Sequence, residues 1–237
     1  MSIAENLRRV QERIAGARQR AERNPREFSL IAVTKTVRPE RIREAYDLGV
    51  RLFGENRVQE FASKAPVLGD LKDIDWHMIG HLQSNKARTA VELFHAVDSV
   101  DSLRLLERLN SVAKELRKTM PVLIEINIGG ERAKSGVAPN SAELDHMLAA
   151  APSCDHLEIR GLMTVPPYDD DPEQSRLFFR RMRALCDEIA SRKLPAVQMG
   201  TLSMGMSHDF EVAIEEGSTC VRIGTAIFGD RPKPREI

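Results

Sequence analysis

The chain has 237 residues, a length that suits one large α/β domain, and 42% of them are hydrophobic, which is enough for a sizeable core. Its 35 basic and 35 acidic residues cancel, which argues against nucleic acid or an anionic membrane as a partner. No stretch is long enough to span a membrane, and the N-terminus has no signal-peptide core and carries glutamates that transit peptides avoid, so a cytoplasmic location is expected.

The cysteines and two of the histidines predict no metal site. Cys154, Cys186 and Cys220 are an odd number without ligand spacing, and they fit structural thiols in a reducing compartment. His77 and His81 bracket a predicted strand rather than lying on a helix, and no carboxylate accompanies them at a known ligand spacing. We expect His77 to be structural and His81 to lie near the mouth of the fold.

The N-terminal residues 3–22 carry apolar side chains at helical spacing among charges, which predicts an amphipathic helix that ends before Pro25. Strands are then predicted at 28–34, 51–54, 76–80, 94–97, 121–127, 158–163, 197–202 and 219–223. Helices are predicted between them at 40–48, 58–65, 85–93, 102–116, 141–150, 172–191 and 210–216.

This alternation indicates a parallel sheet, and eight units at this length favour a closed (β/α)8 TIM barrel of the α/β class. We expect a single domain over residues 1–237, with an extra N-terminal helix in 1–24 and a C-terminal tail at 231–237. The main alternative is a doubly wound open sheet. The glycine fingerprint G-x-G-x-x-G is absent after the first strand, which weakens that alternative.

Lys35 ends the first predicted strand, an apolar run from Phe28 to Thr34. In a parallel barrel the carboxyl ends of the strands form the face where chemistry is usually built. Although most lysines simply face solvent, the apolar strand before Lys35 favours a reactive amine, and desolvation at the barrel mouth would favour its neutral form.

The segments after the last two strands predict a phosphate site. Ser203 and Gly205 follow the seventh strand, and Gly224 and Thr225 follow the eighth. Glycines let the backbone approach an anion, and hydroxyls and free N–H groups can donate to it. Each loop alone would also fit ordinary turns and helix caps. Together with the amine of Lys35, the two loops suit pyridoxal 5′-phosphate (PLP), an aldehyde with a phosphate handle.

Arg222 is flanked by Val221 and Ile223, so we expect it to be buried and to need a partner. One interpretation is a salt bridge to Glu125 or Glu158. The other places the guanidinium against the pyridine nitrogen of the cofactor, which would then stay unprotonated because arginine does not give up a proton.

The motifs AVTKTV, FGENRVQE, WHMIGHLQSNK, GLMTV and LSMGMSHDFEVAIEEGSTCVRIGTAIFG resemble the pyridoxal phosphate homeostasis protein family (the YggS/PROSC type) over nearly the whole chain. That family resembles the barrel domain of alanine racemase. The resemblance implies that Lys35 carries the internal aldimine, that Arg222 faces the pyridine nitrogen and that Asn56 sits beside the cofactor. It also implies that the phosphate is held by Ser203, Gly205, Gly224 and Thr225. Glu55, next to Asn56, is expected to start the following helix.

Two departures from alanine racemase bear on activity. Pro39 stands where the racemase has a tyrosine, and we expect no counterpart of its second domain because little sequence follows the eighth strand. Two-base racemisation needs an acid on each face of the substrate carbon, and neither Tyr46 nor Tyr168 occupies a matching position.

Three functions remain open on the sequence. The favoured one is a PLP-binding protein that holds PLP as a Schiff base on Lys35 and acts in intracellular PLP homeostasis or carriage, with PLP and apo PLP-dependent enzymes as partners and no turnover required. The second is a single-domain PLP-dependent amino-acid racemase. The third is a sugar-phosphate barrel enzyme without PLP. A monomer is expected, with a dimer as the alternative.

Overall fold

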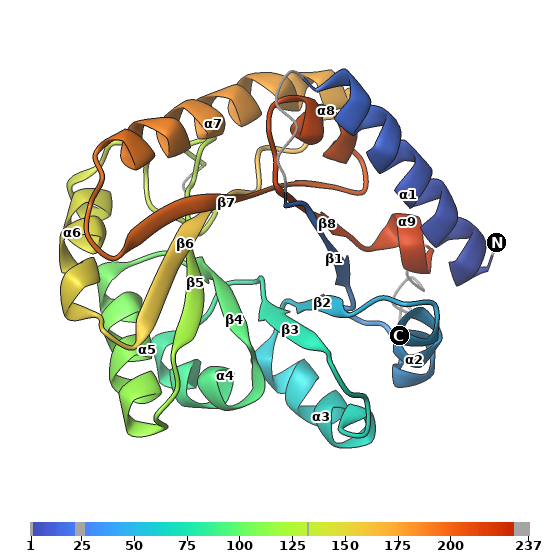
Figure 1. The fold of residues 1–237 in the computed structure, drawn as a ribbon, viewed down its shortest axis with the longest axis horizontal. Coiled ribbons are helices and arrows are strands. Elements are labelled where there is room, and N and C mark those ends of the chain that lie inside the picture. The colour runs from blue at the N-terminus through green and yellow to red at the C-terminus, as the bar shows by residue number, and fades with distance from the viewer. Residues whose placement is uncertain (1, 22–26, 132, 230–237) are drawn as a thin grey trace.

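Eight parallel strands close into a barrel in the order in which they occur along the chain, and helices cover its outside (Figure 1). The strands are β1 (Ser29–Val33), β2 (Leu52–Glu55), β3 (Asp75–Met78), β4 (Ala96–Val100), β5 (Met120–Glu125), β6 (Leu157–Met163), β7 (Val197–Met206) and β8 (Cys220–Ile223). Because β1 also pairs with β8, the predicted TIM barrel is confirmed and the open sheet is excluded.

The computed structural model describes residues 2–21, 27–131 and 133–229. Its helices are α1 (Ile3–Arg20), α2 (Pro39–Asp47), α3 (Val58–Leu68), α4 (Ala87–Leu93), α5 (Leu103–Glu115), α6 (Ala142–Ala150), α7 (Arg176–Ser191), α8 (Phe210–Glu215) and α9 (Thr225–Phe228). Three short 3-10 helices are η1 (Ser84–Lys86), η2 (Ala151–Ser153) and η3 (Pro172–Ser175). The predicted tail at 231–237 and the break at Pro25 lie outside the described residues. Within the described ranges, no helix has the length and apolarity to cross a bilayer.

Predicted strand boundaries differ from the observed ones by a few residues, and the difference at the end of β7 bears on the candidate site. The seventh strand was expected to end at Leu202 with a loop from Ser203, but β7 runs to Met206, which pairs with Arg222 of β8. Serine and glycine are typical of loops, and pairing with β8 overrides that local preference. Ser203 and Gly205 therefore lie within the strand, and the loop begins at Ser207.

Alternate residues of the strands divide between two apolar clusters. Ala32 and Phe53, which are paired in register, belong to the large core between the barrel and the helices. Ile31, Val33, Ile79 and Cys220 form a separate cluster inside the barrel, which we call the inner cluster. Gly54 makes room for it, since a Cβ there would lie 2.6 Å from Ile31 and 2.9 Å from Ile79.

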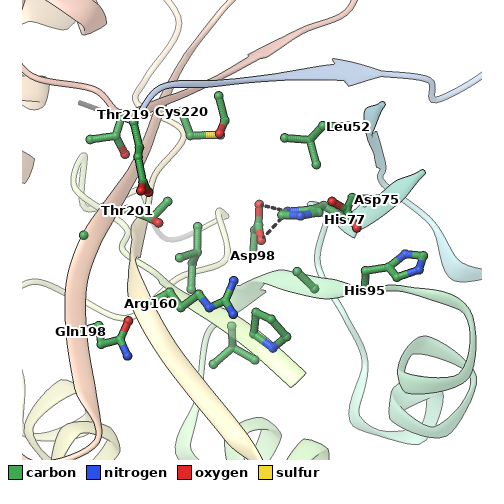
Figure 2. Close-up of a pocket in the computed structure, with 17 residues that line it drawn as sticks. Leu52, Asp75, His77, His95, Asp98, Arg160, Gln198, Thr201, Thr219 and Cys220 are labelled. Carbon is green, nitrogen blue, oxygen red and sulfur yellow. Dashed lines mark hydrogen bonds and ion pairs between the residues drawn. The ribbon is translucent and has the colours of Figure 1, made fainter. Parts of the chain in front are cut away.

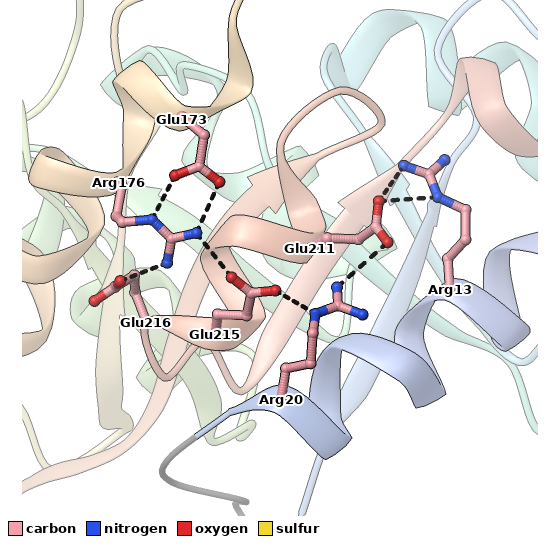
Figure 3. Close-up of polar contacts among 7 residues, drawn as sticks. All are labelled: Arg13, Arg20, Glu173, Arg176, Glu211, Glu215 and Glu216. Carbon is pink, nitrogen blue, oxygen red and sulfur yellow. Dashed lines mark hydrogen bonds and ion pairs between the residues drawn. The ribbon is translucent and has the colours of Figure 1, made fainter.

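The N-terminal helix α1 packs along α8 and α9, as Figure 1 shows, and its position combines apolar burial with ion pairs. Its apolar side is buried, with Ile3 and Val10 each 1% exposed. On its polar side, Arg13 pairs with Glu211 and Arg20 with Glu215 (Figure 3). The predicted extra helix is thus part of the fold and covers the outside of the barrel where the chain closes.

Candidate functional site

The carboxyl ends of the strands bring the predicted amine and the predicted phosphate segment to one rim of the barrel. Lys35 is half-buried two residues beyond the end of β1. β1 pairs with β8 in parallel, with Ala32 opposite Ile223, so Gly224 and Thr225 leave the barrel beside the segment that carries Lys35. A Cβ on Gly224 would lie 3.4 Å from the Val33 backbone, which shows how closely the two strand ends approach.

Arg222 lies in the floor of this rim and is only 3% exposed. Its Nη1 donates to Ser203 Oγ at 2.7 Å, and its Nη2 donates to the carbonyl of Thr164 at 2.8 Å. In the described part of the chain it forms no ion pair with Glu125, and Glu158 pairs instead with Arg160. The salt bridge considered for Arg222 is therefore not formed, and the guanidinium is held by neutral acceptors.

The loop after β7 supplies a hydroxyl that the sequence analysis did not select. Ser207 Oγ accepts hydrogen bonds from the backbone N–H groups of Gly224 and Ala226, at 3.2 and 3.3 Å. It lies where the loops after β7 and β8 meet, and Thr225 is exposed beside it. The strand boundary concealed Ser207, because Ser203 was expected to be the first hydroxyl of that loop.

Gly205 has a packing role. Its φ is +95°, and a Cβ would lie 2.5 Å from Ala213 Cβ and 3.0 Å from Phe210 Cα. Both of these residues belong to α8, so the absence of a side chain at Gly205 lets α8 lie against the end of β7.

Asn56 and Glu125 each bury one side-chain oxygen that could accept a hydrogen bond. Asn56 follows β2 and Glu125 ends β5, so both lie at the carboxyl rim. Asn56 Oδ1 and Glu125 Oε2 are buried, and neither has a hydrogen-bond partner among the residues that the structure describes. Because buried polar atoms are normally satisfied, these two atoms mark positions where a bound molecule can donate.

Glu125 also has a strongly shifted protonation equilibrium. Burial, reinforced by the negative charge of Asp101, raises its pKa to about 7, although Arg222 and His81 act in the opposite direction. A carboxyl group at this rim is therefore partly protonated near neutral pH.

A buried carboxyl group next to Thr34, the residue before Lys35, was not anticipated. Glu55 was expected to start the helix after β2; it is instead the last residue of that strand and 0% exposed. Its Oε1 accepts from Lys64 Nζ at 2.8 Å and from Thr34 Oγ1 at 2.8 Å. Burial raises the pKa of Glu55 despite the partners that lower it. The signal for this cluster was Lys64 itself, which lies on the apolar side of α3 with Phe61 and Leu68.

The amino rim holds a separate cavity of about 490 Å³ (Figure 2). Its deepest charge, Asp98, is 2% exposed and accepts from His77 Nδ1 at 3.1 Å. Burial opposes protonation of His77, but the Asp98 carboxylate outweighs it and raises the pKa of the imidazole. None of the predicted PLP-site residues lines this cavity.

His81 lies at the other rim from His77. It is exposed, and its Nδ1 is 2.9 Å from Asp101. Among residues 2–21, 27–131 and 133–229, no group of three or more His, Cys, Asp or Glu side chains is placed to hold a metal ion. The three cysteines are buried and free, and burial raises the pKa of Cys220 to about 12.

Known proteins are similar in sequence to this chain over nearly its whole length. A pyridoxal phosphate homeostasis protein of Aquifex aeolicus is 46% identical over 232 residues, which cover 98% of this chain and 99% of the relative. The Escherichia coli K12 protein of the same name is 42% identical over 231 residues, with 97% of each chain covered.

Solved structures give the same picture of the fold. PipY of Synechococcus elongatus, solved with PLP bound, is 38% identical with a TM-score of 0.83, covering 96% of this chain and 100% of that one. Alanine racemase of Clostridium difficile has a TM-score of 0.73 over 98% of this chain and 59% of its own; at 15% identity it supports the fold alone. The profile of the family described as alanine racemase, N-terminal domain, matches residues 3–232. The chain thus belongs to the alanine racemase N-terminal domain family and, within it, to the pyridoxal phosphate homeostasis proteins.

Proposed function

We propose that this chain binds PLP at the carboxyl rim of the barrel, holds it as a Schiff base on Lys35 and acts in the homeostasis or carriage of intracellular PLP. The observation that carries the proposal is the pairing of β1 with β8, because it sets the segment of Lys35 beside Arg222, Gly224 and Thr225. A relative of the same family, PipY, was solved with PLP bound, which supports the same ligand here.

The residues present fit this cofactor. When bound, PLP supplies an aldehyde that condenses with a primary amine to a Schiff base with loss of water. Lys35 provides the amine, and Arg222, which is buried and permanently charged, would face the ring nitrogen and keep it unprotonated. Asn56 Oδ1 is an unpartnered acceptor for a ring hydroxyl.

For the phosphate we propose the segment after β8, with Gly224 and Thr225, together with the Ser207 hydroxyl and its backbone donors. Ser203 and Gly205, predicted as phosphate ligands, would contribute indirectly. Ser203 Oγ is engaged by Arg222, and Gly205 accommodates α8.

The alternative of a single-domain racemase has less support. Racemisation needs a proton donor and acceptor on opposite faces of the substrate carbon. Pro39 begins α2 where the racemase has a tyrosine. Tyr46 has its ring 3.9 Å from the Arg51 guanidinium, and Tyr168 is 74% exposed and donates to Asp170.

The proposal is tested on the full chain loaded with PLP. We expect a yellow protein whose absorbance is bleached by borohydride, with the reduced adduct located on Lys35 by peptide mass spectrometry. Lys35→Ala should lose the Schiff-base absorbance and retain weaker PLP binding through the phosphate contacts. Lys114→Ala, which changes an exposed lysine of α5, is the matched control and should behave as the wild type.

Three results would count against the proposal. A colourless protein that takes up no PLP would favour a sugar-phosphate enzyme, and an unchanged spectrum in Lys35→Ala would reject the assigned lysine. Racemisation of alanine by the loaded protein at an enzyme-like rate would favour the racemase. We further propose that apo PLP-dependent enzymes are the partners of this chain, and that it works in the cytoplasm as a monomer. Transfer of PLP from the loaded chain to such an apo-enzyme in a mixed assay tests the carrier role.

A further inference from the structure

Lys35 lies in a tight turn whose conformation is unfavourable for its own sequence. The N–H of Val37 donates to the carbonyl of Thr34 at 2.9 Å, so Lys35 and Thr36 are the two central residues. Thr36 has φ = +63°, in the left-handed region. A β-branched side chain is rare there, and such conformations persist only where the surrounding structure enforces them.

The enforcing contacts come from α3 and flank Lys35 on both sides. On the near side, Lys64 Nζ donates to the carbonyl of Thr34 at 2.9 Å. On the far side, the N–H of Thr36 donates to Glu60 Oε1 at 2.6 Å. Lys64 also donates to Glu60 Oε1 at 2.6 Å, so both flanks of Lys35 are tied to one ion pair, spaced i, i+4 on the helix.

The third hydrogen of the Lys64 ammonium is used by Glu55, which in turn accepts from the Thr34 hydroxyl. An ammonium has three donors, and all three of Lys64 are therefore engaged by oxygens. Burial raises the pKa of Glu60, but the hydrogen bonds from Lys64 and the Thr36 N–H outweigh it and hold the pKa below its ordinary value. With its three donors directed at these oxygens, Lys64 is a poor competitor of Lys35 for an aldehyde.

We propose that Glu60, Lys64 and Glu55 form a positioning cluster that holds the strained turn around Lys35 and thereby directs its amine toward the bound aldehyde. None of the three touches the ligand in this proposal; they act through the backbone of Thr34 and Thr36. The inference rests on the proposed role of Lys35, and it adds that the rate of Schiff-base formation depends on a hydrogen-bond acceptor for the Thr36 N–H.

The experiment compares variants of the full chain from which PLP has been removed before the measurement. Glu60→Met removes the acceptor, whereas Glu60→Gln keeps an oxygen for the Thr36 N–H. The double change Glu60→Met with Thr36→Gly removes the conformational penalty, because glycine adopts a positive φ without strain. Glu12→Met, which breaks the exposed i, i+4 pair with Arg8 on α1, is the matched control. The readouts are the rate at which the Schiff-base absorbance appears after PLP is added, and its pH profile.

We expect Glu60→Met to slow Schiff-base formation about tenfold or more, since small misplacements of a reacting group cost that much. Glu60→Gln and the double variant should recover most of the rate, and Glu12→Met should match the wild type. Lys64→Met should slow the reaction as well, with its fold checked by circular dichroism.

Two outcomes would overturn this inference alone: a wild-type rate in Glu60→Met, or no recovery in Glu60→Gln and the double variant, which would indicate general destabilisation. A wild-type chain that forms no Schiff base on Lys35 would instead overturn the proposed function and this inference with it.

Discussion

Arg222 Nη1 lies 2.7 Å from Ser203 Oγ inside the barrel, and Ser203 is 0% exposed. The same guanidinium reaches the carbonyl of Thr164, just beyond β6. One side chain of β8 therefore connects the interior of β7 with the residue that follows β6, in addition to the charge it presents to the proposed cofactor.

Replacing Arg222 should affect stability as well as the cofactor. Arg222→Ala leaves two buried acceptors without a donor, each costing about 1–3 kcal/mol of the free energy of unfolding. The stability of Arg222→Lys should lie between those of the wild type and Arg222→Ala, because one ammonium does not reproduce two separated guanidinium donors. Urea denaturation measures the effect, with Arg160→Ala, in an exposed pair with Glu158, as the control. Equal stability of the Arg222→Ala and Arg160→Ala proteins would contradict the structural role.

Gly205 should tolerate a methyl group far less well than another glycine of positive φ. Gly49→Ala meets no atom within 4 Å at φ = +94°, so only the left-handed conformation is penalised, by about 1–2 kcal/mol. Gly205→Ala adds a steric overlap with α8, and overpacking typically lowers the free energy of unfolding by a further amount of about 1–3 kcal/mol. Thermal or urea denaturation compares the two. If both variants lost the same stability, the close approach of α8 to β7 would not require glycine.

Glu125 should make stability depend on pH. Its pKa is 4.5 ordinarily and about 7 in the folded chain. Between these values the folded state binds more protons than the unfolded state, so the free energy of unfolding falls as pH rises through this range. The pKa shift corresponds to about 3 kcal/mol of the free energy of unfolding, and this stability is fully lost at pH values above the pKa of the folded chain.

Glu125→Gln tests this dependence. The variant should be more stable than the wild type above neutral pH. The difference in the free energy of unfolding should shrink as the pH falls toward about 5. Urea denaturation at a series of pH values isolates the effect, since other titrating groups, His77 among them, are common to both proteins. A difference that does not change with pH would show that the carboxyl group titrates normally.

Arg176 should stabilise the closure of the barrel in a salt-dependent way. It pairs with Glu173, Glu215 and Glu216, and Glu215 also accepts from Arg20 of α1 (Figure 3). These contacts raise the pKa of the guanidinium, chiefly through the hydrogen bond to Glu173.

Arg176→Met should lower the free energy of unfolding by about 1–2 kcal/mol, since exposed pairs contribute about 0.2–1 kcal/mol each. High salt should reduce the difference from the wild type because it screens exposed charges. Arg8→Met, which breaks a solitary exposed pair, should change stability little. An equal loss in both variants would show that the network adds nothing beyond a single pair.

The barrel was predictable because its evidence is repeated along the chain. Eight apolar runs alternate with amphipathic segments, and errors of a few residues at each boundary do not change the topology. The boundary at Leu202 bears on the candidate site: serine and glycine favour a loop from Ser203, whereas pairing with β8 extends β7 to Met206.

The proximity of the candidate site residues was predictable only where they share a rim by topology. Strand ends of a parallel barrel converge, so Lys35, Arg222 and Gly224 could be grouped from the sequence. The positioning cluster could not be predicted. It depends on the rotation of α3 and on a positive φ at Thr36, and threonine rarely adopts a positive φ. Ser207 was missed for another reason: with the seventh strand expected to end at Leu202, Ser203 and not Ser207 was the first hydroxyl of the loop.

The inner cluster of Ile31, Val33, Ile79 and Cys220 forms an apolar floor inside the barrel. This cluster lies between the cavity at the amino rim, which Cys220 also lines, and the segment that carries Lys35. A molecule held on Lys35 would enter and leave by the same opening, so an acceptor that collects it directly would have to dock over the loops that close around it.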